Sequence, residues 1–401
     1  MHATAIATSR RLIGIGVALL LAAIVAVPAE AADRKGPRGG GFYDPPKRLP
    51  NGHGKLIWKR AATKLTPIAG AKVNKTILYT SRSPQGEKVA VSGSVSVPPG
   101  KPPKGGWPVI AWAHGTTGGA DSCAPTRIRP TGPNAGFVAY IHPQLEQWIA
   151  AGYAVVASDY QGLGTPGPHP YLVGKAEGRS VLDGVRAARR LVPDLGRKFL
   201  IAGHSQGGQS ALFAAAMSDR WTPELKLRGT VAYAPASHIE EQAKLLPALT
   251  SPSPLSGLGA LIFSGAATTS KDVSPRKILA RDARALLPQI EQLCLLQLAE
   301  PDSFGAIAPA DLFKRGADLS GLYDVLDDMN PALKIGPPIL LAQGTADTTV
   351  FPSYSDMLVA ELGERGGDVD YRTYPGVNHG LIVGAAEDDA MDFFQQRLPA
   401  R

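Results

Sequence analysis

The feature that most constrains this chain is a Gly-x-Ser-x-Gly pentapeptide, Gly203-His204-Ser205-Gln206-Gly207. It follows an apolar run, Phe199 to Ala202, that predicts a buried strand, and it precedes residues 208–216, which predict a helix. In that context the motif is typical of a nucleophile elbow, a tight turn on which the serine hydroxyl stands clear of the backbone. The two glycines leave room where a side chain would strike a neighbouring strand or helix. A turn whose serine only caps the helix is the alternative.

The rest of the chain alternates between strands and helices. Predicted strands cover residues 75–80, 89–97, 108–113, 153–158, 230–235, 338–344 and 369–374, and predicted helices cover 144–151, 177–191, 354–362 and 388–398. The first two strands are joined by a short turn at Ser83 to Gly86, which predicts an antiparallel hairpin. The later alternation predicts an α/β fold with a mostly parallel central sheet and the hairpin at one edge.

Residues 237–336 break this alternation. They contain several apolar helical stretches and no convincing strand. An insertion between two strands of such a sheet lies above the carboxyl ends of the strands, where ligands bind. We therefore expect a largely helical cap or lid, with a core built from residues 42–236 and 337–401.

The N-terminus is expected to be an export signal. Arg10 and Arg11 precede an apolar run from Leu12 to Val27, and small residues at Ala29 and Ala31 supply a cleavage site, so residues 1–31 are predicted to be a signal peptide. The run is short for a membrane span. The paired arginines also match a twin-arginine signal, so both export routes stay open. We expect a secreted, periplasmic or wall-associated protein.

The chain is basic, with 42 Lys and Arg against 34 Asp and Glu. Residues 32–41 are rich in Gly, Lys and Arg and are predicted to be a disordered basic arm. Such an arm can bind acidic surfaces, although a solvated arm is the simpler interpretation. No aromatic interleaving or nucleic-acid motif accompanies it, so we expect no nucleic-acid partner.

Three residues at strand ends form a candidate catalytic triad. Ser205 is followed in chain order by Asp347, three residues after a predicted strand, and by His379, just past the last predicted strand. The carboxyl ends of parallel strands open on one edge of a sheet, so these residues can meet. His379 would take the proton of Ser205, and Asp347 would orient the imidazole. Asp356 and Asp370 are poorly placed alternatives, in a predicted helix and a predicted strand.

The oxyanion hole is predicted less completely. The backbone N–H of Gln206 supplies one donor, and the segment His114-Gly115-Thr116, which follows a predicted strand, supplies the second. The N–H of Gly115, the N–H of Thr116 and a side chain of this segment all remain candidates, and a plain turn is the alternative. We expect His204 to pack beside the elbow.

The cysteines and carboxylates suggest no cofactor chemistry. In an exported protein the pair Cys123 and Cys294 suggests a disulfide, with two free buried thiols as the alternative. Glu240-Glu241 and Asp327-Asp328 lack His or Cys neighbours at ligand spacing, so we predict neither a metal nor a cofactor.

Several motifs together resemble the secretory lipase (lipase A-like) family of α/β-hydrolases, from about Phe42 to Leu398. They are Phe42-Tyr43-Asp44-Pro45-Pro46, Leu78-Tyr79, Ser92-Gly93, Cys123-Ala124-Pro125, Gly152 to Val156, Asp159-Tyr160, the elbow, and the Asp347 and His379 loops. The resemblance implies an α/β-hydrolase fold, hydrolysis of carboxylic esters, often triacylglycerols, and a lid built from the insertion. It also implies Ser205 as nucleophile with Asp347 and His379 as partners, and a Cys123–Cys294 bridge from the oxyanion loop to the cap.

We therefore predict a secreted carboxylic ester hydrolase, a lipase or esterase that acts through an acyl-enzyme. Its expected partner is a small-molecule or lipid ester, with transient contact between the cap and a lipid interface. A peptidase or amidase and an acyltransferase are alternatives on the same fold. A non-catalytic binding protein is disfavoured because no triad member is missing.

Overall fold

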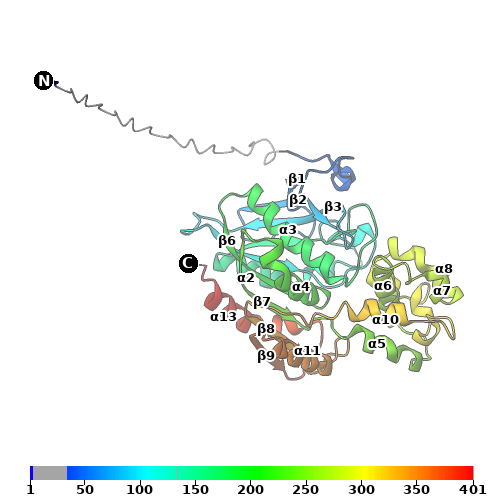
Figure 1. The fold of residues 1–401 in the computed structure, drawn as a ribbon. Coiled ribbons are helices and arrows are strands. Elements are labelled where there is room, and N and C mark those ends of the chain that lie inside the picture. The colour runs from blue at the N-terminus through cyan, green and yellow to red at the C-terminus, as the bar shows by residue number, and fades with distance from the viewer. Residues whose placement is uncertain (3–33, 133, 401) are drawn as a thin grey trace.

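The computed structural model describes residues 1–2, 34–132 and 134–400 (Figure 1). The predicted signal peptide, residues 1–31, lies outside the described residues except for its first two. Within the described ranges one sheet has nine strands, in the order β1-β2-β3-β5-β4-β6-β7-β8-β9. The strands are β1 (Leu56–Ala61), β2 (Val73–Arg82), β3 (Lys88–Val97), β4 (Trp107–Ala113), β5 (Ala154–Ser158), β6 (Leu195–His204), β7 (Lys226–Tyr233), β8 (Ile339–Gly344) and β9 (Val369–Tyr374).

The sheet has an antiparallel edge and a parallel body. β1, β2 and β3 pair antiparallel, and β3 also runs antiparallel to β5. From β5 through β4, β6, β7 and β8 to β9 every pair is parallel. The predicted α/β fold with an N-terminal antiparallel hairpin is confirmed. β1 was not predicted, because it is an edge strand whose sequence passes from three apolar residues to Lys59 and Arg60.

Helices cover both faces of the sheet. They are α1 (Gly136–Ala139), α2 (His142–Ala151), α3 (Gly174–Leu191), α4 (Gln206–Trp221), α11 (Pro352–Glu364), α12 (Ile382–Ala385) and α13 (Glu387–Arg397). Alternate residues of the central strands point to opposite faces: Phe199 of β6 packs in the cluster that holds α3, α4 and α11, and Leu200 packs in the cluster that holds α2, α12 and α13. Among the described residues, no helix is long and apolar enough to span a bilayer.

The segment between β7 and β8 is helical. It contains α5 (Ile239–Leu245), α6 (Leu255–Ala267), α7 (Pro275–Ile278), α8 (Arg281–Leu286), α9 (Leu295–Leu298) and α10 (Ser320–Asp327). These helices gather beside the core in Figure 1 and share an apolar cluster of their own. The cluster also takes in Tyr171 and Leu172, from the loop between β5 and α3. The helical segment therefore packs against the loop that follows β5.

The described part of the basic arm is ordered against β1, which differs from the predicted disorder. The N–H of Gly36 donates to the carbonyl of Lys59 at 3.1 Å, and the N–H of Lys59 donates to the carbonyl of Arg34 at 3.1 Å. Phe42, just after this segment, is fully buried near Trp58, whose ring N–H donates to the Phe42 carbonyl. These hydrogen bonds pair backbone groups at the outer edge of β1, and the composition of the arm does not reveal this pairing.

Candidate active site

Ser205 lies on a sharp turn between β6 and α4. Its backbone has φ 58° and ψ −117°, a conformation that L-residues rarely adopt. Neighbouring backbone holds it there: the N–H of Ser205 donates to the carbonyl of Tyr233 at 2.9 Å, and its carbonyl accepts from the N–H groups of Gln209 and Ala236. A strained residue persists where its surroundings determine it this fully, and such residues gather at active sites.

The glycines that flank Ser205 are required by close packing. A Cβ on Gly203 would lie 2.0 Å from the carbonyl oxygen of Gly207, and a Cβ on Gly207 would lie 1.9 Å from that of Ala113. Both distances are far inside van der Waals contact. The turn can therefore sit against β4 only with glycine at these positions, as the motif predicts.

The loops after β8 and β9 bring Asp347 and His379 to Ser205. The Nε2 atom of His379 is 2.9 Å from the Ser205 hydroxyl oxygen, and its Nδ1 atom is 2.7 Å from a carboxylate oxygen of Asp347. Asp347 is fully buried, whereas the His379 side chain is 19% exposed. The other two aspartates have different partners: Asp356 accepts from the hydroxyl of Tyr371, and Asp370 pairs with Arg372.

The Asp347 carboxylate is stabilised in its ionised form. Burial by itself would raise its pKa, but the bonds from His379 and from the N–H groups of Thr349 and Val350 outweigh burial and bring the pKa below the ordinary value. A carboxylate that stays ionised holds the Nδ1–H tautomer of His379, so Nε2 is left to accept the Ser205 proton.

The candidate oxyanion segment follows β4, and its groups have different partners. The His114 ring is buried, which lowers its pKa to about 4, and its Nδ1–H donates to the carbonyl of Gly115 at 2.7 Å. The hydroxyl of Tyr140 lies beside Gly115, and its pKa is raised by burial and lowered in part by the Gly115 N–H. The Thr116 hydroxyl is 2.7 Å from the hydroxyl of Tyr171. The backbone N–H groups of Gly115 and Thr116 are the two candidate donors of this segment.

Two hydrogen bonds join Tyr140, which lies beside Gly115, to the His379 loop. The Tyr140 hydroxyl donates to Nδ1 of His204 at 2.9 Å. Nε2 of His204 donates to the carbonyl of His379 at 3.0 Å. Burial, and then His379, lower the pKa of His204 to about 3, so its ring is neutral near pH 7. The sequence predicted only that His204 packs beside the elbow. Nothing in the sequence indicated a contact between Tyr140 and His204.

A buried carboxylate, which the sequence did not indicate, holds the side chain of Gln206. Glu177 of α3 accepts from the Gln206 amide at 2.7 Å and from the Leu172 N–H at 2.9 Å, and its other oxygen bonds the Ser210 hydroxyl. Burial raises the pKa of Glu177 to about 7. The Gln206 amide nitrogen also lies 3.0 Å from Nε2 of His169, whose pKa burial lowers to about 3.

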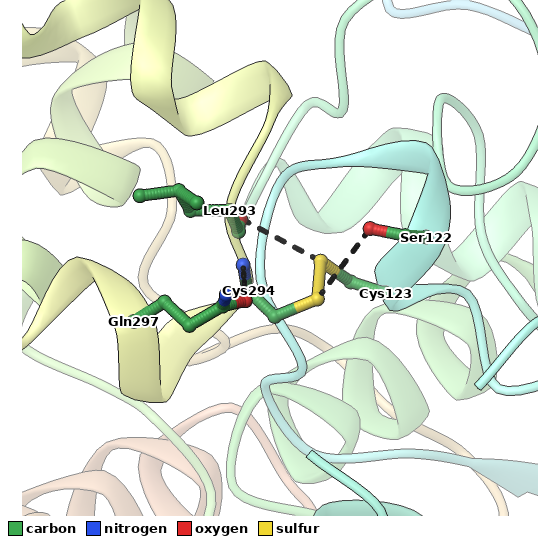
Figure 2. Close-up of a disulfide and its surroundings, with 5 residues drawn as sticks. All are labelled: Ser122, Cys123, Leu293, Cys294 and Gln297. Carbon is green, nitrogen blue, oxygen red and sulfur yellow. Dashed lines mark hydrogen bonds between the residues drawn. A yellow bond between two sulfur atoms is a disulfide. The ribbon is translucent and has the colours of Figure 1, made fainter. Parts of the chain in front are cut away.

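A disulfide ties the loop after β4 to the helical segment (Figure 2). Cys123 and Cys294 are bonded, with their Cα atoms 5.5 Å apart, as predicted. The N–H of Leu295 donates to the carbonyl of Thr117 at 3.0 Å. The backbones of Gly118 and Cys294 also form an isolated antiparallel β-bridge. In Figure 2 the N–H of Cys294 is also held by the side chain of Gln297. The candidate oxyanion segment is thus fixed from the cap side.

The sheet and the turn at Ser205 define an α/β-hydrolase. A family model described as "Secretory lipase" matches residues 139–398, and the chain belongs to this family. Lipase A of Moesziomyces aphidis is 29% identical over 223 residues, which span 52% of this chain and 46% of that protein, so the match covers less than half of this relative.

Solved structures share the fold. Candida antarctica lipase A in its closed state superposes with a TM-score of 0.73 at 21% identity, over 88% of this chain and 85% of that one. The rice cell wall degrading esterase LipA of Xanthomonas oryzae, in a ligand-bound form, superposes with a TM-score of 0.70 at 20% identity, over 87% of this chain and all of that one. At these identities the likeness concerns the fold.

Proposed function

We propose that this protein hydrolyses carboxylic esters through an acyl-enzyme formed on Ser205. The observation that carries the proposal is the pair of contacts from His379, at 2.9 Å to the Ser205 hydroxyl and 2.7 Å to Asp347. The same three residues at the ends of parallel strands are the pattern that the sequence predicts. Membership of the secretory lipase family gives independent support.

In the proposed reaction the hydroxyl oxygen of Ser205 attacks the ester carbonyl while Nε2 of His379 takes its proton. The imidazolium then protonates the departing alcohol, and a water molecule, activated by the same nitrogen, releases the acid. Asp347 keeps the ring in place and stabilises its positive charge. The tetrahedral oxyanion would be held by the N–H of Gln206 and by the N–H of Gly115 or of Thr116.

The substrate is proposed to carry an apolar acyl group. On the helical segment Leu245, Leu249, Leu255 and Leu296 are exposed, and beside the triad loops Phe351 and Leu381 are exposed. This distribution supports a cap that contacts a lipid interface. A peptidase would need carboxylates to bind an amine, but Glu240 is already paired with Lys244 at 2.7 Å.

The test is hydrolysis of p-nitrophenyl esters from two to sixteen acyl carbons by the mature protein and by Ser205→Ala. We expect the variant to lose several orders of magnitude in kcat/KM. A maximum at long chains would support a lipase, and one at short chains an esterase. Equal inactivity of both proteins on every ester would overturn the proposal. Adding a small alcohol would reveal acyl transfer as a competing product.

We further propose that the protein is exported and that residues 1–31 are removed. The family description supports export. The N-terminal sequence of protein collected outside the cytoplasm is expected to begin at Ala32. An intact Met1 on exported material would contradict the proposed cleavage.

A further inference from the structure

A cationic cavity lies at the end of the core opposite the candidate active site. It measures about 680 Å³ and is lined by the charged residues Lys55, Arg186, Arg189, Arg190, Arg197 and Glu224. Arg186, Arg189 and Arg190 come from the C-terminal turns of α3, and Arg197 comes from the start of β6. Ser205 follows the far end of the same strand, roughly 25 Å away at the usual rise per residue. The cavity is therefore separate from the triad.

One of the arginines is held in place by buried groups. Asp183, whose side chain is fully buried, accepts from Nδ1 of His53 at 2.6 Å and from the hydroxyl of Ser81 at 2.8 Å. Nη1 of Arg186 lies 3.2 Å from Nε2 of the same His53 ring, the nitrogen that can accept when Nδ1 donates to Asp183. The other side of this guanidinium makes two bonds to Glu224, at 2.6 and 2.7 Å.

The loop that carries His53 is shaped to fit against Arg186. Gly54 has φ 64°, and a Cβ there would lie 2.6 Å from the Arg186 side chain. Such a position accepts glycine and excludes larger residues. Arg186 thus forms a rigid wall of the cavity, with its guanidinium already bound to Glu224.

The remaining cations are not neutralised. Glu224 is the single carboxylate among the lining residues, all of which are described, and it is already bound by Arg186. The pKa of Lys55 is lowered by burial and then by Arg190 and Arg186, and that of Arg189 by burial and then by Arg197. The cations therefore repel one another across the cavity, and an anion placed between them would relieve this repulsion.

We propose that this cavity binds a soluble or polymer-borne ligand that carries several phosphate groups. Guanidinium groups bind phosphate oxygens through paired hydrogen bonds, and several of them converge here. A single phosphate would fill a small part of a cavity of this size, so a chain of phosphates uses more of the available charge. Because the cavity is distant from Ser205, a ligand bound there would anchor the enzyme without obstructing the triad.

Calorimetric titration of the mature protein with tripolyphosphate tests the proposal. We expect saturable binding with one site, and a loss of affinity of about tenfold for each arginine replaced in Arg190→Glu/Arg197→Glu. Both side chains are exposed, so folding should survive. An unchanged melting temperature and ester-hydrolysis rate would confirm that it does.

The matched control is Lys271→Glu/Arg281→Glu, which changes the net charge equally at two exposed positions that do not line this cavity. We expect its affinity for tripolyphosphate to stay within about twofold of the parent protein, because local geometry and not total charge binds the ligand. No binding to the parent protein, or equal weakening in both variants, would overturn the proposal. So would capture by phosphatidylglycerol vesicles without binding of tripolyphosphate, since the ligand would then be a lipid surface.

Discussion

The turn at Ser205 and the segment from His114 to Gly119 supply the two halves of the candidate site, but they are built differently. The turn is determined by its own backbone and by glycines packed against adjacent strands. The segment after β4 is held by distant groups: the Cys123–Cys294 disulfide, the bond from Leu295 and the hydroxyls of Tyr160 and Tyr171. We infer that the position of Ser205 is a local property of the sheet, whereas the position of the candidate oxyanion segment depends on the helical segment between β7 and β8.

The largest effect is expected from breaking the turn. In Gly207→Ala the new Cβ would lie 1.9 Å from a backbone oxygen of β4, so the turn must move. We expect kcat/KM to fall about ten-thousandfold, as for loss of a catalytic group. The control is Gly363→Ala in α11, where a Cβ meets nothing within 4 Å. It should match or slightly exceed the parent stability, and an active Gly207→Ala would refute the local origin of the turn.

Removing the disulfide tests the other half of the comparison. Cys123→Ser/Cys294→Ser opens a loop with a sequence separation of 171 and should lower the free energy of unfolding by about 5 kcal/mol in the chain-entropy model. Below its melting temperature the folded variant should lose kcat with little change in KM, because the oxyanion segment is no longer fixed from the cap. Unchanged kcat in the folded variant would show that the cap does not set this geometry.

Glu177 should make stability depend on pH. Its pKa is raised from 4.5 to about 7, so the folded state binds the proton more tightly than the unfolded state does. Proton binding therefore adds to the free energy of unfolding at low pH, and this contribution is lost as pH rises through about 7. The difference corresponds to about 3 kcal/mol at most. Because His169 has a pKa of about 3, it stays neutral over this window. Melting temperatures of the parent should fall relative to those of Glu177→Gln between about pH 5 and 8, and parallel curves would contradict this.

The smallest effect is expected from His204, which bonds the Tyr140 hydroxyl and the His379 carbonyl beside the triad. His204→Phe keeps a ring beside His379 but loses both hydrogen bonds, and we expect kcat to fall about tenfold with KM unchanged. His204→Gln, which can still bond the His379 carbonyl, should recover part of the rate. If both variants keep full kcat, then His204 only fills space.

Local patterns in the sequence predict the fold well, and they select three residues whose side chains lie together in the structure. The alternation of strands and helices predicted the parallel sheet. Positions just after predicted strands selected Ser205, Asp347 and His379, which the structure brings together. The contacts that fix the oxyanion segment are different in kind. The Tyr171 hydroxyl reaches Thr116 across 55 residues of sequence, and no periodicity encodes such a contact. The order of the arm against β1 likewise depends on a long-range edge pairing.

The most direct test of the central claim is to trap the nucleophile. A p-nitrophenyl alkylphosphonate mimics the tetrahedral intermediate and transfers its phosphorus to an activated serine. We predict one equivalent of p-nitrophenol released per protein, with the added mass on the peptide that contains Ser205. Labelling should disappear in Ser205→Ala and slow greatly in His379→Ala. Absence of labelling in the parent protein, or a label on another residue with Ser205 unmodified, would contradict the proposed triad.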